Sequence, residues 1–350
     1  MVFSQNAEQK FIDILHSTHY DFLKTTPSLG DNIIYLTLSG SHAYGTNNEH
    51  SDTDVRGIFL NTKKEILTME CSDRPFEHRE TDTVIYPLKQ IIKLLSNCNP
   101  NCIELLGTKD EHVLLCSPQG KLIRDNADIF LSKSAINTFG GYATAQLRRL
   151  QNALARDNYP KAEKERHILG SIENQMVTFK DRYKEIDDDL NLYIDYVNSG
   201  DLNKKDKEIL IDLTMKGYPL RDLKGMYSEM NNVIRDYDKL NHRNSKKDDL
   251  HLNKHAMHLV RLLIMGTEIL QGKGIHTHRE KDHSLLMNLR NGTYVSEKNG
   301  VKDYSDVFTI VDKYEKEFDY AKKECVLPDK PAYDAIADLV MEINKHVLMN

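Results

Sequence analysis

The first third of the chain alternates between short apolar runs and polar turn segments, a pattern typical of a small sheet. Residues 33–38 and 55–60 have the length and the β-branched content of strands. A third strand is expected at residues 81–86, directly before Pro87, which opens a helix. The pattern therefore predicts a mixed α/β region in this part of the chain.

Helical periodicity dominates elsewhere. Residues 5–24 are expected to form an amphipathic helix whose apolar face carries Phe11, Ile14, Leu15 and Phe22. From about residue 125 onward strand signals become scarce, and two long helices are expected at residues 139–153 and 251–271. A polar loop is expected at residues 236–250. The chain is thus predicted to be an α+β protein with a mostly helical second part.

Length and composition suit two globular domains, which we expect at residues 1–130 and 131–350. No apolar run approaches 18 residues, so no membrane span is expected, and the first ten residues lack the layout of a secretion signal. The five cysteines show no zinc pattern and indicate free thiols in a reducing cytoplasm. A net charge of −6 provides no global basic surface for nucleic acid, so any nucleic acid is expected to bind at a local basic cleft.

The segment between the first two expected strands carries the most specific chemistry. It reads G-S-H-A-Y-G-T-N-N-E-H-S-D-T-D at residues 40–54. Gly40 allows the backbone to approach a phosphate closely, and Ser41 supplies a hydroxyl and an N–H group. Asp52 and Asp54 are expected in the second strand, where side chains two residues apart share a face.

Two carboxylates on one face of a sheet repel each other unless a positive charge lies between them. A hard divalent cation, Mg2+ or alternatively Mn2+, held by carboxylates and by phosphate oxygens of a substrate, is the usual solution. Taken alone, Asp52 and Asp54 are better explained as solvated acids at a loop–strand junction. Gly40 and Ser41, directly after a buried-looking strand, favour a site for nucleotidyl transfer.

A third acidic group is expected because two-metal phosphoryl transfer needs a ligand for the metal that activates the attacking hydroxyl. Asp82, at the start of the third strand, is well placed to meet Asp52 and Asp54 across the sheet. Glu80 lies on the same face but further out, and it is the alternative, as is a surface role for these acids.

The two long helices carry polar stripes. On the helix at residues 251–271, Lys254, His258 and Arg261 share one stripe of a circumference that is otherwise apolar. These cations suit a triphosphate, arginine in particular because it binds phosphate through two N–H groups. The alternative is that they pair with core acids such as Glu268 or extend to the surface.

The helix at residues 139–153 aligns Tyr142, Gln146 and Arg149. Tyr142 suits stacking on a base, Gln146 suits a hydrogen bond to its edge, and Arg149 suits a phosphate. The same stripe is equally suited to an interface between domains. Tyr44, close to Gly40 and Ser41 in sequence, is a further candidate for contact with a nucleotide.

The string G-S-x-A-Y-G-T-x-x-x-x-S-D-x-D-x-R-G resembles the active-site signature of the DNA polymerase beta nucleotidyltransferase superfamily. More narrowly, it resembles the predicted nucleotidyltransferase family linked to RNA repair, the RlaP-like group that also occurs in phages. The fitting positions are Gly40, Ser41, Ala43, Tyr44, Gly45, Thr46, Ser51, Asp52, Asp54, Arg56 and Gly57. Further resemblances lie at G-Y-A-x-A-Q-L, at K-H-A-M-H-L-V-R-L-L, and around Arg279 and Arg290.

This resemblance implies a small mixed sheet followed by a helical domain that closes the nucleotide cleft. It implies Mg2+-dependent transfer of a nucleoside monophosphate from an NTP to an acceptor hydroxyl, with release of pyrophosphate. Asp52 and Asp54 would hold Mg2+ on the triphosphate, and Asp82 would complete the second metal site. Gly40 and Ser41 would bind the β- and γ-phosphates.

The acceptor implied by the resemblance is an RNA 3′ end, such as that of a damaged tRNA. Transfer to a protein hydroxyl or to a small molecule is a close alternative. A different class of function is also compatible with the scaffold, namely a non-catalytic nucleotide-binding regulatory protein. All three carboxylate positions are filled, which argues against decay of the site.

Overall fold

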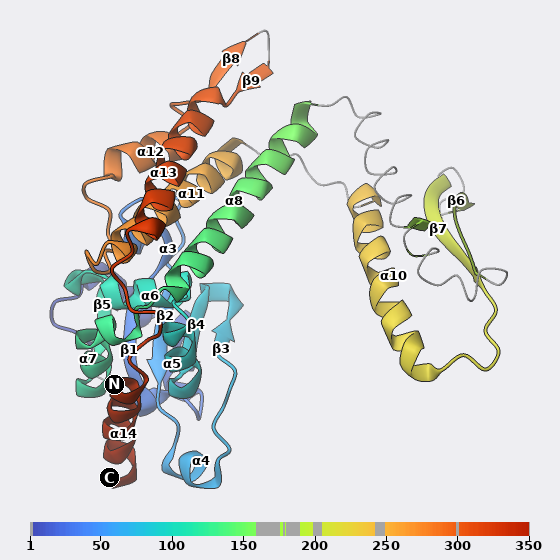
Figure 1. Ribbon diagram of the computed structural model, residues 1–350. Coiled ribbons are helices and arrows are strands. Elements are labelled where there is room, and N and C mark those ends of the chain that lie inside the picture. Colours follow the sequence, from blue (N-terminus) through green and yellow to red (C-terminus); the bar gives the residue numbers. More distant parts are fainter. Residues whose placement is uncertain are drawn as a thin grey trace. The chain divides into compact units, whose positions relative to one another are not determined.

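The computed structural model describes residues 3–158, 176, 177, 179, 190–198, 205–241, 249–298 and 301–349. The chain forms two compact units (Figure 1). The first, here called the sheet unit, joins Met1–Leu150 with Asp249–Asn350, and the second, the inserted unit, comprises Gln151–Asp248. The chain therefore leaves the sheet unit near residue 150 and returns to it at residue 249, in contrast to the expected division at residue 130.

The sheet unit is built on a five-stranded mixed sheet. Its strand order is β3 (Phe76–His78), β4 (Thr83–Pro87), β2 (Val55–Phe59), β1 (Ile33–Leu38) and β5 (Val113–Cys116). β1 is antiparallel to β2 and β5, β3 is antiparallel to β4, and β2 is parallel to β4. The α+β class and the three expected strands are confirmed.

Helices surround this sheet and fill the remainder of the sheet unit. Their bounds are α1 Gln9–Leu15, α2 Phe22–Thr25, α3 Gly40–Tyr44, α4 Lys63–Thr68, α5 Leu88–Ser96, α6 Pro100–Ile103, α7 Pro118–Asp125, α8 Ser134–Asn158, α11 Asp249–Leu270, α12 His283–Arg290, α13 Ser305–Lys323 and α14 Tyr333–Met349. A short hairpin, β8 (Ser296–Lys298) and β9 (Val301–Asp303), precedes α13. Within the described part of the chain, we find no helix with the length and apolarity needed to cross a membrane.

The core lies on both sides of β1, all six residues of which are buried. Apolar side chains of α1, such as Phe11 and Leu15, pack into one cluster with Leu36 and Leu38 of β1. α11 is buried over most of its circumference, as its sequence predicted, and it packs against α12 and α13. Asn253 and Arg261 are buried with this helix, whereas His251 and Lys254 are exposed.

Three local expectations are corrected by the fold. The helix expected over residues 5–24 is divided into α1, a 3-10 turn at Thr18–Tyr20, and α2. The segment after β1 begins as the short helix α3 instead of a loop. Asp52 and Asp54 precede β2 instead of lying within it. In each case tertiary packing decides where a short element ends.

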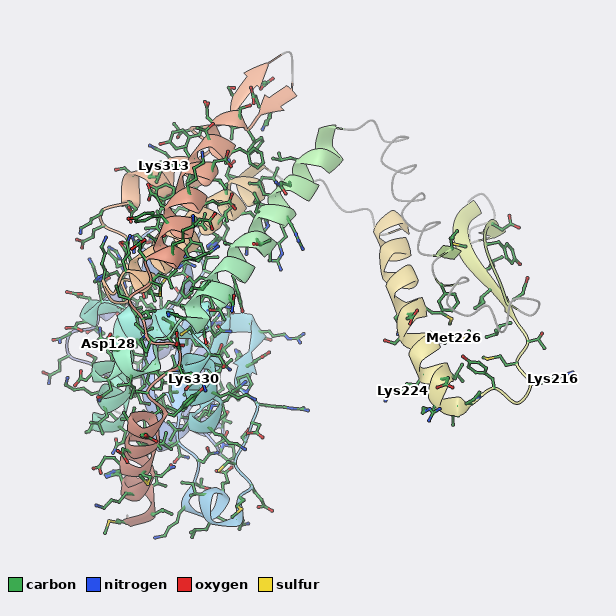
Figure 2. All side chains as sticks on the ribbon, in the orientation of Figure 1. Asp128, Lys216, Lys224, Met226, Lys313 and Lys330 are labelled. Carbon is green, nitrogen blue, oxygen red and sulfur yellow. The ribbon has the colours of Figure 1, made fainter. Side chains whose placement is uncertain are left out.

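The inserted unit contains a two-stranded antiparallel ribbon that the helical expectation missed. β6 (Leu190–Asn198) pairs with β7 (Lys205–Leu213) along its whole length, and α10 follows at Leu220–Asn241. Apolar residues alternate with polar ones along much of both strands, but the high charge of this region obscured the period of two. Met226 of α10 is buried within this unit (Figure 2). Part of the polar loop expected at residues 236–250 is therefore helix, and residues 242–248 lie outside the described residues.

Replacement of Gly57 by alanine tests how closely the central strands approach one another. A Cβ at Gly57 would lie 2.5 Å from Leu36 Cδ2 and 2.6 Å from the Tyr35 carbonyl oxygen. We expect Gly57→Ala to lower the free energy of unfolding by about 1–3 kcal/mol, because overpacked cores cost that much. Gly141→Ala in α8 is the matched control, since nothing lies within 4 Å of its Cβ, and it should stabilise by up to about 1 kcal/mol. Urea denaturation measures both, and equal effects would contradict this packing.

Candidate active site

The parallel register of β2 and β4 brings two carboxylates together. Val55, the first residue of β2, pairs with Thr83, the first residue of β4. Asp54 and Asp82 each precede their strand by one residue, so the same register places them side by side. Their carboxyl groups are close enough to share a hydrogen bond.

Burial and mutual proximity shift the pKa values of Asp54 and Asp82 in opposite directions. Burial and the hydrogen-bonded carboxylate of Asp82 together raise the pKa of Asp54 from 3.8 to about 7. The hydrogen bond from Asp54, assisted by the charge of Arg56, holds the pKa of Asp82 below its usual value. The pair therefore shares one proton near neutral pH, with Asp54 as donor. A divalent cation would displace that proton and neutralise both charges.

The N-terminus of α3 lies directly against this pair. Gly40 has a positive φ of 58°, and a Cβ at this position would overlap the Asp54 carboxylate, so glycine is required there. The N–H of Ser39 donates to the Asp54 carbonyl at 2.9 Å and fixes this approach. Because the first turn of a helix leaves its N–H groups without intrahelical acceptors, Gly40 and Ser41 present donors beside the carboxylates.

Asp52 and Glu80 are close to this pair in sequence but take no part in its hydrogen bond. Asp52 is exposed, and Glu80 is exposed on the 3-10 turn Arg79–Thr81 that precedes Asp82. Among the residues that the structure describes, no group of three His, Cys, Asp or Glu side chains is positioned to hold a metal. The fold thus pairs Asp82, not Glu80, with Asp54. These two carboxylates suit Mg2+, which commonly takes one or two carboxylates plus phosphate oxygens.

Arg261 of α11 is engaged in the core instead of facing a nucleotide. Its Nη1 lies 3.1 Å from Glu104 Oε2, and both side chains are 4% exposed. Tyr44 donates its hydroxyl to Glu104 Oε1 at 2.7 Å, and the Arg261 guanidinium lies 3.6 Å from the centroid of the Tyr44 ring. The structure thus shows the alternative in which this stripe pairs with a core acid. That acid is Glu104 and not Glu268. Tyr44 is likewise buried.

The other two members of the α11 stripe differ from each other. His258 lies edge-on to Tyr44, with ring centroids 6.2 Å apart, and burial lowers the pKa of His258 to about 3, so it is neutral. Lys254 is exposed, and its positive charge favours the ionised form of both Asp54 and Asp82. Of the three residues, Lys254 is therefore the one that offers a positive charge at the carboxylate pair.

The expected stripe on α8 connects to α11 beside Lys254. Gln146 Oε1 lies 3.0 Å from Nδ1 of His255, the neighbour of Lys254. Tyr142 is 37% exposed, and its hydroxyl accepts a hydrogen bond from Asn99 at 3.4 Å. Arg149 is exposed. Their contacts with a nucleotide stay a prediction.

Residues from the C-terminal part of the chain hold the signature segment in place, and sequence reasoning did not assign them this role. Arg290 donates from Nη1 to the Thr46 carbonyl and from Nη2 to Ser51 Oγ at 3.2 Å. The N–H of Arg279 donates to the Tyr44 carbonyl at 3.1 Å. The motifs around Arg279 and Arg290 were the available signal, but only the fold shows what these arginines contact.

A comparison with protein families agrees with this geometry. Residues 5–172 match the family described as RNA repair pathway DNA polymerase beta family, RlaP. The match includes the sheet, α3 and the Asp54–Asp82 pair, and it confirms the resemblance drawn from the signature. No curated protein and no solved structure gives a significant match to the chain.

The shared proton predicts an unusual dependence of stability on pH. Between about pH 4 and pH 7 the folded chain holds a proton on Asp54 that the unfolded chain has lost, so stability falls as pH rises through this window. Asp54→Asn should remove this fall and raise the free energy of unfolding at pH 8 by on the order of 1–2 kcal/mol, allowing for solvent screening. Denaturation with EDTA present measures it. Asp52→Asn, at an exposed acid, should keep the wild-type profile, and parallel profiles for all three proteins would contradict the shared proton.

The buried ion pair predicts a strong effect on folding. Glu104→Gln leaves the Arg261 charge buried without its partner and should cost about 3–5 kcal/mol of stability. Adding Arg261→Met to the same chain should recover much of that loss, because the pair is then replaced instead of broken. Thermal and urea denaturation of Glu104→Gln, Arg261→Met and the double variant measure this. Additive losses would show that Arg261 and Glu104 do not act as a pair.

Proposed function

We propose that this chain, assigned through residues 5–172 to the polymerase-beta-like RNA repair family, transfers a nucleoside monophosphate from an NTP to an acceptor hydroxyl and releases pyrophosphate. The family match indicates a nucleotidyltransferase with NTP and nucleic acid as partners. The observation that carries the finer proposal is the Asp54–Asp82 pair, which lies against the N-terminus of α3 and within the field of Lys254.

Asp54 and Asp82 are the residues that would hold Mg2+, or Mn2+ in its place, and Asp52 is the additional ligand in our proposal. The fit rests on the two carboxylates in mutual contact, whose shared proton marks a place for a cation. When bound, Mg2+ neutralises triphosphate charge and lowers the pKa of a hydroxyl that it binds. Release of the proton from Asp54 makes both carboxylates available as ligands.

The remaining residues of the site divide into direct and indirect roles. Gly40 and Ser41 bind the β- and γ-phosphates through the free N–H groups of α3. Lys254 neutralises charge on the triphosphate. Tyr142, Gln146 and Arg149 contact the base and the phosphates from α8. These α8 contacts are expected from the sequence alone.

Tyr44, His258 and Arg261 support the site indirectly, without contacting the nucleotide. The bond from Tyr44 to Glu104 and the ion pair of Glu104 with Arg261 connect the end of α3 to α11. We therefore assign these residues to holding α3 against the helix that carries Lys254, in place of the direct contact with nucleotide expected from the sequence.

The acceptor in our proposal is an RNA 3′ end, such as that of a damaged tRNA. The match of residues 5–172 to an RNA repair pathway family supports this choice. The net charge of −6 requires that RNA binding depend on local cations such as Lys254. Proteins and small molecules are the other acceptor classes, which the following experiment distinguishes.

Incubation with each α-labelled NTP and Mg2+, with and without total tRNA, tests the reaction. Label is expected on RNA, and Asp54→Asn and Asp82→Asn should each lower the rate more than about 100-fold, since even residues that only support metal ligands cost 10–100-fold. Glu80→Gln is the matched control and should stay within a few-fold of wild type.

Other results would redirect the proposal. Label on the protein itself or on an added protein would replace RNA as the acceptor. Binding of an NTP with no label on any acceptor would favour a non-catalytic nucleotide-binding protein. Loss of activity in Glu80→Gln with full activity in Asp82→Asn would show that the third acid is Glu80.

A further inference from the structure

Arg56 makes an unusual set of contacts with one residue. Its Nη1 donates to the Asp82 carbonyl oxygen, and its Nη2 donates to Asp82 Oδ1 at 3.0 Å. The same Nη1 donates to the carbonyl of Val55 at 3.0 Å. The Arg56 side chain is 19% exposed and that of Asp82 is 59% exposed, so the guanidinium is the more buried partner of the ion pair. One guanidinium therefore fixes both the main chain and the side chain of Asp82.

The backbone of Asp82 requires such support. Its φ of 41° and ψ of 45° lie in the left-handed region, which costs a residue with a Cβ roughly 1–2 kcal/mol. On either side the chain is held by hydroxyl contacts, from Thr81 Oγ1 to His78 Nδ1 at 3.0 Å and from Thr81 Oγ1 to Thr83 Oγ1 at 2.9 Å. Those contacts fix the flanking turn, whereas Arg56 holds Asp82 itself.

The strand register explains how Arg56 reaches this position. Arg56 lies on β2 two residues after Asp54 and pairs with Val84 of β4, two residues after Asp82. The Arg56 side chain thus reaches back across two parallel strands to the acid of the neighbouring strand. Arginine is required because two separate N–H groups in a planar fork make the contacts, and lysine has one nitrogen.

We propose that Arg56 is a positioning residue that fixes Asp82 in the left-handed turn and presents its carboxylate to Asp54 as the second ligand of a divalent cation. The inference rests on the proposed function only in naming the cation. Arg56 holds one carboxylate oxygen of Asp82, Oδ1, and thereby would fix the orientation of the group toward a cation. The carboxylate pair then depends on Arg56 as well as on its own two acids.

A double-mutant cycle tests this coupling without turnover. Mn2+ binding to the full chain is measured by electron paramagnetic resonance for wild type, Arg56→Lys, Asp82→Asn and the double variant. Arg56→Lys keeps the charge and removes the fork, and asparagine tolerates the left-handed backbone. We expect Arg56→Lys to weaken Mn2+ binding about 10-fold or more in wild type. On the Asp82→Asn background the same change should have less than about a twofold effect, because the residue that Arg56 positions is no longer a charged ligand.

Arg79→Lys is the matched control, since Arg79 is an exposed arginine of the turn before Asp82, and Mn2+ affinity should not change. An equal loss on both backgrounds, or no loss at all, would overturn the proposal, as would absence of Mn2+ binding to wild type. Circular dichroism identifies a variant that fails to fold, and Arg56→Gln then serves as the second substitution.

Turnover measured in parallel separates this inference from the proposed function. Arg56→Lys should lower kcat and leave the KM for NTP within about twofold, whereas a direct contact of Arg56 with the triphosphate would raise KM. Coupled Mn2+ binding without nucleotidyl transfer would leave the role of Arg56 intact and refute the reaction. Nucleotidyl transfer by a chain in which Arg56 and Asp82 are uncoupled would refute the role of Arg56 and leave the reaction intact.

Discussion

The parallel pairing of β2 with β4 is the constraint on which the candidate site depends. Asp54 and Asp82 lie 28 positions apart in the sequence, and the register of Val55 with Thr83 makes them neighbours. A slip of one residue would turn one of the two side chains to the opposite face of the sheet. Burial on both faces of the central strands resists such a slip, so the packed core also sets the geometry of the two acids.

This geometry is unfavourable for stability by itself. Burial, and the carboxylate of Asp82 beside it, raise the pKa of Asp54, so holding both acids ionised in this position is unfavourable. The left-handed turn at Asp82 adds backbone strain. Strain and like charges that persist in a fold otherwise well packed are typical of a site kept for binding or catalysis.

Contacts from the C-terminal part of the sheet unit offset the unfavourable charge and strain at Asp54 and Asp82. α11 brings Lys254 to the carboxylate pair and fixes the end of α3 through the buried contact of Arg261 with Glu104. Arg290 binds the carbonyl of Thr46 in the signature segment. The chain leaves the sheet unit within α8, near residue 150, and returns in α11, so residues from both sides of the insertion contribute to the candidate site.

The sequence by itself determined the class of the fold, the strands around the signature, the buried character of α11, and the residue types of the site. These features follow from local periodicity and from a motif that is contiguous along the chain. Only the tertiary structure decided between Asp82 and Glu80 as the partner of Asp54, and only it showed that Arg261 pairs with Glu104 and that Asp52 remains exposed. The same stripe of cations suits either a triphosphate or a core acid, and the choice depends on which groups the distant segments bring opposite it. Pairing across strands and helices is non-local, and local propensity carries no information about it.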